Sequence, residues 1–161
     1  MGLSAPSLYN AFGDKGALFA EAFAAYENEY GGSVERAVRE APSAIAALHR
    51  VIGDAPGMHT RSGLPRGCLV ANGDLGATEP KVRELFARSH ARNRALLLER
   101  LLSDPATHEW DESTCTALVD YVLAVRAGLA QSARRGATRK DLEAAAEVAA
   151  RAIPTVAEPE Q

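Results

Sequence analysis

A chain of 161 residues with 47% hydrophobic side chains is long enough to bury one sizeable core, and its length is typical of a single domain. Its formal net charge of −3 excludes a protein that binds nucleic acid over its whole surface, so any contact with DNA must be local. Aromatic residues make up only 6%, alanine is abundant, and alternating runs of valine, isoleucine, threonine and tyrosine are missing. The sequence therefore predicts an all-α protein.

Residues that usually carry catalysis or hold metals are sparse. Cys68 and Cys115 have no close spacing, so neither a disulfide framework nor a zinc site is predicted. The histidines never stand three or four apart on one helix, and no nucleophile elbow, phosphate loop or dinucleotide fingerprint occurs. We therefore expect no metal, no cofactor and no enzymatic activity. No signal peptide or apolar run near the ~20 residues of a membrane span is found, which favours a cytoplasmic protein without a membrane partner.

The first twenty residues are the most informative segment. Ser4 is a good N-cap for a short helix over residues 5–12 that ends near Phe12. Gly13 ends that helix, and Asp14 caps the next one. The side chains that project away from its apolar face are Ser7, Tyr9 and Asn10. Small, aromatic and amide side chains on one face are typical of the second helix of a helix-turn-helix, which enters the major groove of DNA.

This segment resembles the recognition helix of TetR-family transcriptional regulators. The matching positions are Gly2, Leu3, Ser4, Leu8, Tyr9, Phe12, Asp14, Lys15 and Leu18. The resemblance implies that Tyr9 and Lys15 contact the DNA backbone, and that residues near the bases are Ser4, Ala5, Ser7 and Asn10. A cation in the first turn opposes the helix dipole, so Lys15 does not stabilise its helix. Next to a helix N-terminus, it can instead bind a phosphate group. A capped surface helix in another bundle would explain the capping but not the positions of Tyr9 and Lys15.

In the resembled family, two further helices precede the recognition helix, whereas this chain starts at the turn between the motif helices. Two explanations stay open, a start codon assigned too late and a truncated protein. We expect residues 1–30 to form a partial helix-turn-helix domain that includes the start of a linking helix. Residues 31–154 would form a ligand-binding and dimerisation domain, and residues 155–161 a frayed tail.

The linking helix is predicted by apolar residues spaced by three and four from Leu18 to Val38, a period that continues across Gly31 and Gly32. Two interior glycines cost about 1 kcal/mol each relative to alanine, so we expect a kink or local fraying at this point. In the resembled family, this helix connects the DNA-reading head to the ligand-binding body.

The middle of the chain predicts three further helical segments. Ser43 opens a helix with an inner stripe of Ile45, Leu48, Ile52 and Ala55. Residues 56–67 are expected to form a loop because they hold three glycines and two prolines. A short helix weakened by Gly73 follows over residues 67–75 and resembles a helix near the pocket mouth of TetR-family bodies. Thr78 is predicted to cap the next helix.

The candidate ligand pocket is chosen from helices that surround the cavity in the resembled family, with polar or aromatic residues taken from them. These residues are His49, Met58, Phe86, His90, Asn93, Trp110 and Tyr121. His49 could instead be a satisfied core histidine. Ser89, His90 and Asn93 interrupt an apolar stripe, so they either bond to neighbouring helices or orient a ligand.

The last two helices are the candidate dimerisation elements. Asp111 begins a helix that is apolar nearly all round, which predicts burial on two sides. Thr138 and Asp141 form a capping-box-like pair at the start of the last helix, which Pro154 ends. Two such helices from each chain would form a four-helix bundle, although packing within one chain is an alternative. The residues expected in the homodimer interface are Leu118, Val122, Val125, Leu129, Leu142, Ala146 and Ala149.

The resemblance implies a homodimeric TetR-family regulator, and we expect it to be a repressor that an unidentified small molecule releases from a palindromic operator. The alternative is a ligand-binding and dimerisation module that does not bind DNA by itself. An enzyme built on a helical bundle is a more remote third hypothesis. Salt-dependent binding to DNA upstream of its own gene would separate the first two.

Overall fold

The structure is a computed structural model that describes residues 13–155, and these residues form helices and turns without a β-strand. In chain order the elements are α2 (Lys15–Tyr26), η1 (Glu27–Gly31), α3 (Ser33–Glu40), α4 (Ala44–Gly53), α5 (Ala55–His59), α6 (Leu69–Asn72), η2 (Gly73–Gly76), α7 (Pro80–Ser103), η3 (Pro105–Thr107), α8 (Glu112–Arg134) and α9 (Arg139–Ala150). The all-α prediction is confirmed. The short helix predicted over residues 5–12 lies outside the described residues.

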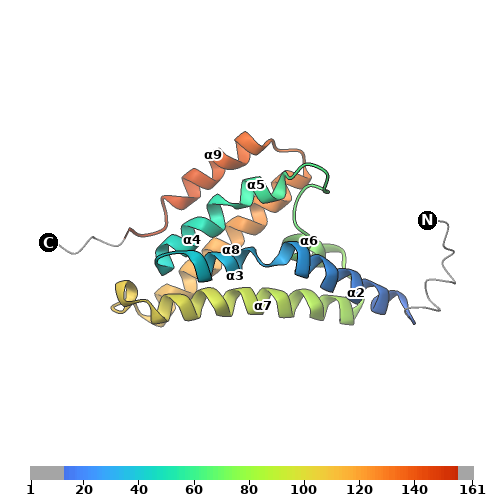
Figure 1. Ribbon diagram of the computed structural model, residues 1–161, viewed down its shortest axis with the longest axis horizontal. Coiled ribbons are helices and arrows are strands. Elements are labelled where there is room, and N and C mark those ends of the chain that lie inside the picture. The colour runs from blue at the N-terminus through green and yellow to red at the C-terminus, as the bar shows by residue number, and fades with distance from the viewer. Residues whose placement is uncertain (1–12, 156–161) are drawn as a thin grey trace.

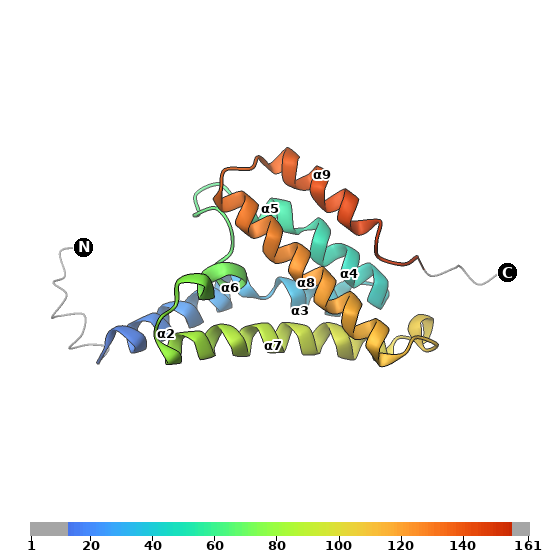
Figure 2. The ribbon, with the colours of Figure 1, turned by 180° about the vertical axis from the view of Figure 1, so that it is seen from behind.

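Two long helices, α7 and α8, organise the molecule. α2 and α3 lie along α7, while α4 and α5 pack against α8 and α9 (Figures 1 and 2). Phe23 of α2 meets Phe86 of α7 edge to face, with ring centroids 5.0 Å apart, and Phe19 lies 5.9 Å from the same ring. α7 is therefore the helix against which α2 is held, at the level of the aromatic rings.

The helix that starts at Lys15 is interrupted where the paired glycines stand. Residues Glu27–Gly31 form a π-helical turn, and regular helix resumes at Ser33 as α3. The kink predicted at Gly31 and Gly32 is confirmed, and its form is a widened turn that accommodates an extra residue. The expected domain boundary between residues 30 and 31 falls inside this turn and stays a prediction.

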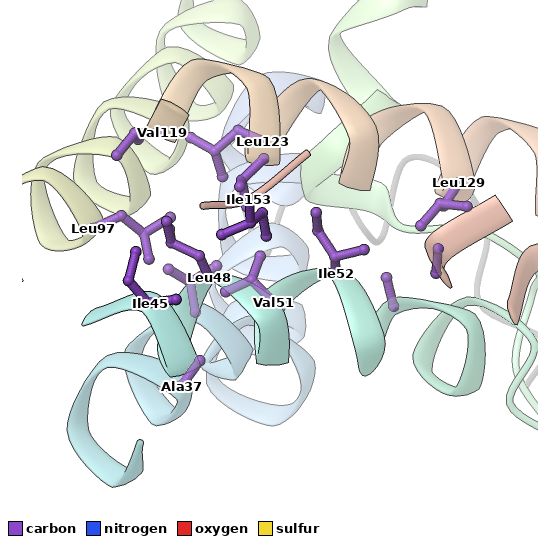
Figure 3. Packing of buried hydrophobic residues seen from close by; sticks show 14 of the residues in the cluster. Ala37, Ile45, Leu48, Val51, Ile52, Leu97, Val119, Leu123, Leu129 and Ile153 are labelled. Atoms are coloured by element: carbon purple, nitrogen blue, oxygen red, sulfur yellow. The ribbon is translucent and has the colours of Figure 1, made fainter. Parts of the chain in front are cut away.

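The core lies where α4 packs against α7 and α8. Figure 3 shows Leu48 and Ile52 of α4 facing Val119 and Leu123 of α8, with Leu97 of α7 beside them. Leu48, Ile52 and Val119 are 0% exposed, and Leu97 is 1% exposed. All members of the predicted inner stripe are buried, but its last member, Ala55, begins α5 and does not belong to α4. Truncation of one of these leucines to alanine would cost about 2–5 kcal/mol.

Four helix starts follow the capping predictions, at Asp14, Ser43, Asp111 and Thr138. Ser43 Oγ accepts a hydrogen bond from a backbone N–H of α4, and Asp111 Oδ1 does the same for α8. Thr138 and Asp141 form a complete capping box at the start of α9, with Oδ2 of Asp141 2.9 Å from the N atom of Thr138. These side chains satisfy N–H groups that have no partner within their helices.

Two local predictions need correction. Thr78 does not cap α7, because the N-cap is Glu79 and the helix begins at Pro80. Residues 55–59 are helical, whereas a loop was expected from residue 56. Proline in the first turn of a helix lacks only an N–H that would have no partner, so Pro56 starts α5 instead of excluding it.

α8 is long and apolar enough, by length and composition alone, to cross a membrane, and the expectation that no segment approaches this limit is corrected. Its buried residues include Cys115, Val119, Val122 and Leu129, which belong to the hydrophobic core. The helix contacts α4, α5, α7 and α9. Its apolar character is therefore explained by its central position in the bundle.

Candidate functional site

The described residues include the start of α2, next to the segment expected to read DNA. Gly13 has a φ angle of 88°, a left-handed conformation that glycine adopts without strain. Asp14 caps α2 by accepting a hydrogen bond from the N–H of Ala17 at 2.7 Å, and Lys15 follows as an exposed cation in the first turn. The other residues expected to touch DNA lie outside the described residues, and their role stays a prediction: Ser4, Ala5, Ser7, Tyr9 and Asn10.

A cavity of about 410 Å³ lies where α2 and the π-helical turn meet α5, the following loop and the end of α8. Its lining residues are Tyr26, Tyr30, Met58, His59, Arg61, Leu64, Pro65, Arg66, Gly67, Cys68, Leu69 and Arg134. This set is mostly apolar or aromatic, with three arginines, one histidine and no carboxylate. Its volume falls in the range of small-molecule sites in proteins, ~300–1,000 Å³.

Two tyrosines from the π-helical region form one wall of the cavity. The rings of Tyr26 and Tyr30 have centroids 5.2 Å apart, and the guanidinium carbon of Arg61 lies 5.6 Å from the Tyr30 centroid. The Tyr26 hydroxyl donates to Cys68 Sγ at 3.9 Å and accepts from the N–H of Leu69 at 3.3 Å. Burial raises the pKa of Tyr26, and the neighbouring Cys68 acts in the same direction, so the phenol stays protonated at neutral pH.

His59 is the most deeply buried residue of the lining, with 1% of its surface exposed. Burial lowers its pKa from 6.5 to about 4, and the positive charge of nearby Arg126 acts in the same direction. The ring is therefore neutral at pH 7. Its Nε2 atom is buried without a hydrogen-bond partner among the described residues. The ring lies against the backbone of Gly67 and Arg126, and because Nε2 itself is buried, a molecule in the cavity does not reach this atom.

Arg126 stands behind His59 as a second unusual group. It is only 5% exposed, and its Nη2 donates to Ser33 Oγ at 3.1 Å. Within the described part of the chain, no carboxylate lies within 4.0 Å of its guanidinium. A buried cation without an ionic partner makes this side of the cavity electropositive.

The loop of residues 60–67 is fixed to the C-terminal end of α8. Arg66 donates from Nε to the carbonyl of Ala133 at 3.1 Å and from Nη2 to the carbonyl of Ala137. Gly67 has a φ angle of 98°, and a Cβ atom there would lie 2.4 Å from Cγ of Arg134. The loop and the side chain of Arg134 therefore hold each other in place, and only glycine fits at residue 67.

The residues predicted to bind a ligand do not share one cavity. Among them, Met58 lines the cavity described above. Phe86 packs in the aromatic cluster with Phe19 and Phe23, and Asn93 lines a separate polar hollow beside the π-helical turn. Their binding roles stay predictions.

The four remaining candidates lie elsewhere in the body. His90 is exposed on α7, and His49 is half-buried on α4. Trp110 packs against the core, and the Tyr121 hydroxyl donates to the carbonyl of Ala149 at 2.8 Å. None of the four lines the cavity that contains Met58.

Most of the cavity lining was missed from the sequence. Tyr26 and Tyr30 fit the apolar helical period, so nothing in the spacing showed that a π-helical turn would place both on one cavity. His59 and Arg61 lay in a segment expected to be a loop, and Arg134 is far away in sequence. Two signals were available: the methionine, histidine and leucine in that segment, and the short helix expected near a pocket mouth, whose first residues Gly67, Cys68 and Leu69 do line the cavity.

The residues predicted for the dimer interface are mostly turned toward the core of their own chain. Val122 is 0% exposed, and residues at 2–5% are Leu129, Leu142 and Ala146. The partly buried members, which pack against the core, are Leu118, Val125 and Ala149. Val125, Leu129 and Leu142 also line a shallow groove between α8 and α9, and Val148 of α9 is 63% exposed, so the interface assignment stays a prediction.

No family model matches the chain. It is 26% identical to the HTH-type transcriptional repressor BdcR of Escherichia coli (strain K12), over 98% of this chain and 77% of BdcR.

Two solved structures are more similar still. One is a cysteine mutant of the TetR family transcriptional regulator CifR complexed with 26bp double-strand operator DNA. It superposes with a TM-score of 0.82 and is 31% identical, over 94% of this chain and 81% of that one. The other is a putative TetR transcriptional regulator from Rhodococcus sp. RHA1, with a TM-score of 0.66 and 32% identity, over 95% of this chain and 83% of that one.

Proposed function

Because the chain belongs to the TetR family of transcriptional regulators, we propose that it is a homodimeric repressor that a small molecule releases from a palindromic operator. The observation that carries this proposal is the match to CifR, whose structure contains operator DNA. The similarity to BdcR, which is named a transcriptional repressor, supports repression in preference to activation. The proposal places the protein in the cytoplasm with the DNA and assigns it no catalytic step.

The proposed DNA contacts come from the start of α2 and from the segment before it. Lys15 is exposed in the first turn of α2, where backbone N–H groups and the helix dipole favour an anion. A lysine at such a position neutralises a DNA phosphate and releases counterions. The proposed residues of the recognition helix are Ser4, Ala5, Ser7, Tyr9 and Asn10.

The proposed dimer contact uses the outer faces of α8 and α9. A shallow groove between these helices is lined by small residues that include Gly128, Ser132 and Ala145. Val148 is exposed on the neighbouring turn of α9. Small side chains let a second pair of helices approach closely, as in a four-helix bundle with two-fold symmetry.

Release from DNA requires that a ligand in the body changes the position of the DNA-reading head. α2 ends at Tyr26, and the π-helical turn that follows places both Tyr26 and Tyr30 on the cavity. A molecule in the cavity therefore touches the segment that joins α2 to the body. Coupling of about 1–3 kcal/mol between two sites is the usual scale for such regulation.

Binding to DNA upstream of the protein's own gene tests the proposal. We expect tight, salt-dependent binding by fluorescence anisotropy, at least a hundredfold tighter than binding to a shuffled fragment. Lys15→Gln should weaken binding to both fragments and reduce the slope of log K against log salt by about one. Lys140→Gln is the matched control, because Lys140 is also exposed in the first turn of a helix but belongs to α9.

Two results would count against the proposal. Equal affinity for both fragments would contradict a sequence-specific operator. A chain that dimerises without binding either fragment would support the alternative function, a ligand-binding and dimerisation module.

A further inference from the structure

We propose that the cavity beside the π-helical turn binds a small organic acid. Its carboxylate would lie at the rim near Arg61 and Arg134, and its apolar body against Tyr26 and Tyr30. This inference rests on the proposed function, because it names the chemical class of the effector for that function.

The charge of the cavity selects an anion. The lining contains three arginines and no aspartate or glutamate. Arg66 is engaged with the carbonyls of Ala133 and Ala137, so it contributes charge from a fixed position. Arg61 and Arg134 are exposed at the rim, and neither has a carboxylate within 4.0 Å among the side chains that the structure describes. Their guanidinium groups can therefore bind a carboxylate through paired N–H donors.

The walls of the cavity select an apolar body. Between the arginines and His59, the lining consists mainly of Tyr26, Tyr30, Met58, Leu64 and Leu69. An inorganic phosphate or sulfate would leave most of a volume of about 410 Å³ and its apolar walls unfilled. A flat ring or a short acyl chain would bury these walls and gain ~25 cal/mol for each Å² of apolar surface removed from water.

His59 closes the inner end of the cavity. It is 1% exposed, and its ring is neutral at pH 7, so it adds no second positive charge at this end. The buried charge of the neighbouring Arg126 disfavours a cationic group on the ligand.

These features predict a ligand with a carboxylate on an apolar body. The probe para-hydroxyphenylacetate has a carboxylate and a flat ring, para-hydroxyphenylacetamide lacks the charge, and acetate lacks the ring. Isothermal titration calorimetry with the full chain measures each Kd. We expect the aromatic acid to bind at least tenfold more tightly than its amide and at least tenfold more tightly than acetate.

Arginine variants identify the end of the cavity that holds the charge. The double variant Arg61→Gln with Arg134→Gln should weaken binding of the acid about tenfold and leave binding of the amide unchanged. Arg83→Gln is the matched control, since Arg83 is an exposed arginine on α7 that does not line the cavity. Helical content by circular dichroism verifies that each variant is folded.

Three results would overturn the inference: equal affinity of acid and amide, an unchanged Kd for the acid in the folded double variant, or no heat of binding for any of the three probes. The same samples are titrated with the upstream DNA fragment. Failure to bind acid by a chain that binds this DNA refutes the ligand class alone. Binding of the acid by a chain that ignores the DNA refutes the proposed function and leaves the ligand class standing.

Discussion

Acidification from pH 7 to pH 5 should destabilise the fold through His59. Burial and the charge of Arg126 lower the pKa of this histidine from 6.5 to about 4. Between these values, the unfolded chain binds a proton at this residue that the folded chain does not bind. The contribution to stability is therefore complete above about pH 7 and is lost as the pH falls from 6.5 toward 4. The titration of His59 in the unfolded chain, compared with that in the folded chain, lowers the free energy of unfolding by about 2 kcal/mol between pH 7 and pH 5.

Urea unfolding followed by far-UV circular dichroism, at one protein concentration, measures this loss. His59→Gln should flatten the pH dependence between pH 7 and pH 5. His108→Gln should keep it, because His108 has a side chain that is 73% exposed. The carboxylates with lowered pKa values, such as Asp104 and Asp141, lose their contributions below this range. The reasoning would be refuted if the wild-type chain were equally stable at pH 7 and pH 5. It would also be refuted if His59→Gln kept the wild-type dependence of the free energy of unfolding on pH.

Two further substitutions test the proposed dimer and the packing of the body. Val148→Asp on α9 should raise the dimer dissociation constant about tenfold or more in analytical ultracentrifugation. Leu102→Asp, at a residue on α7 that is 48% exposed, should leave this constant unchanged. An unchanged dissociation constant in Val148→Asp would contradict the proposed contact. Asp104→Asn should lower the free energy of unfolding by about 1.5–3 kcal/mol, because the buried Asp104 carboxylate accepts the N–H of Ala44 at 2.6 Å. Asp120→Asn should lower it by at most about 1 kcal/mol, since its ion pair is exposed. Equal losses in urea unfolding at pH 7 would contradict the importance given to Asp104.

Features of the fold that depend on neighbouring residues could be predicted from the sequence. The caps at Ser43, Asp111 and Thr138 are examples, because a side-chain oxygen and a backbone N–H two or three residues later decide them. The kink at Gly31 was predictable for the same reason, since glycine weakens a helix wherever it occurs. The cap expected at Thr78 was wrong, because Glu79 takes the cap position before Pro80.

The site depended on long-range packing, which the spacing of residues does not encode. His59 and Arg134 line the same cavity although they are distant in sequence. Tyr26 and Tyr30 fit an ordinary apolar stripe, and only the π-helical turn brings both to the cavity. The dimer residues were chosen from the apolar faces of the last two helices. Part of those faces belongs to the chain's own core, as Val122 shows, while Val125, Leu129 and Leu142 also line the groove between α8 and α9, so the interface stays a prediction.

We expect a molecule in the cavity and operator DNA to oppose each other's binding. The most direct measurement is the Kd for the upstream DNA fragment, by fluorescence anisotropy, at increasing concentrations of para-hydroxyphenylacetate. We expect the Kd for DNA to rise by about fivefold to 150-fold at saturating acid, and the Kd for the acid to rise by the same factor on saturation with DNA. An unchanged Kd for DNA at a concentration of acid that saturates the cavity would contradict the claim.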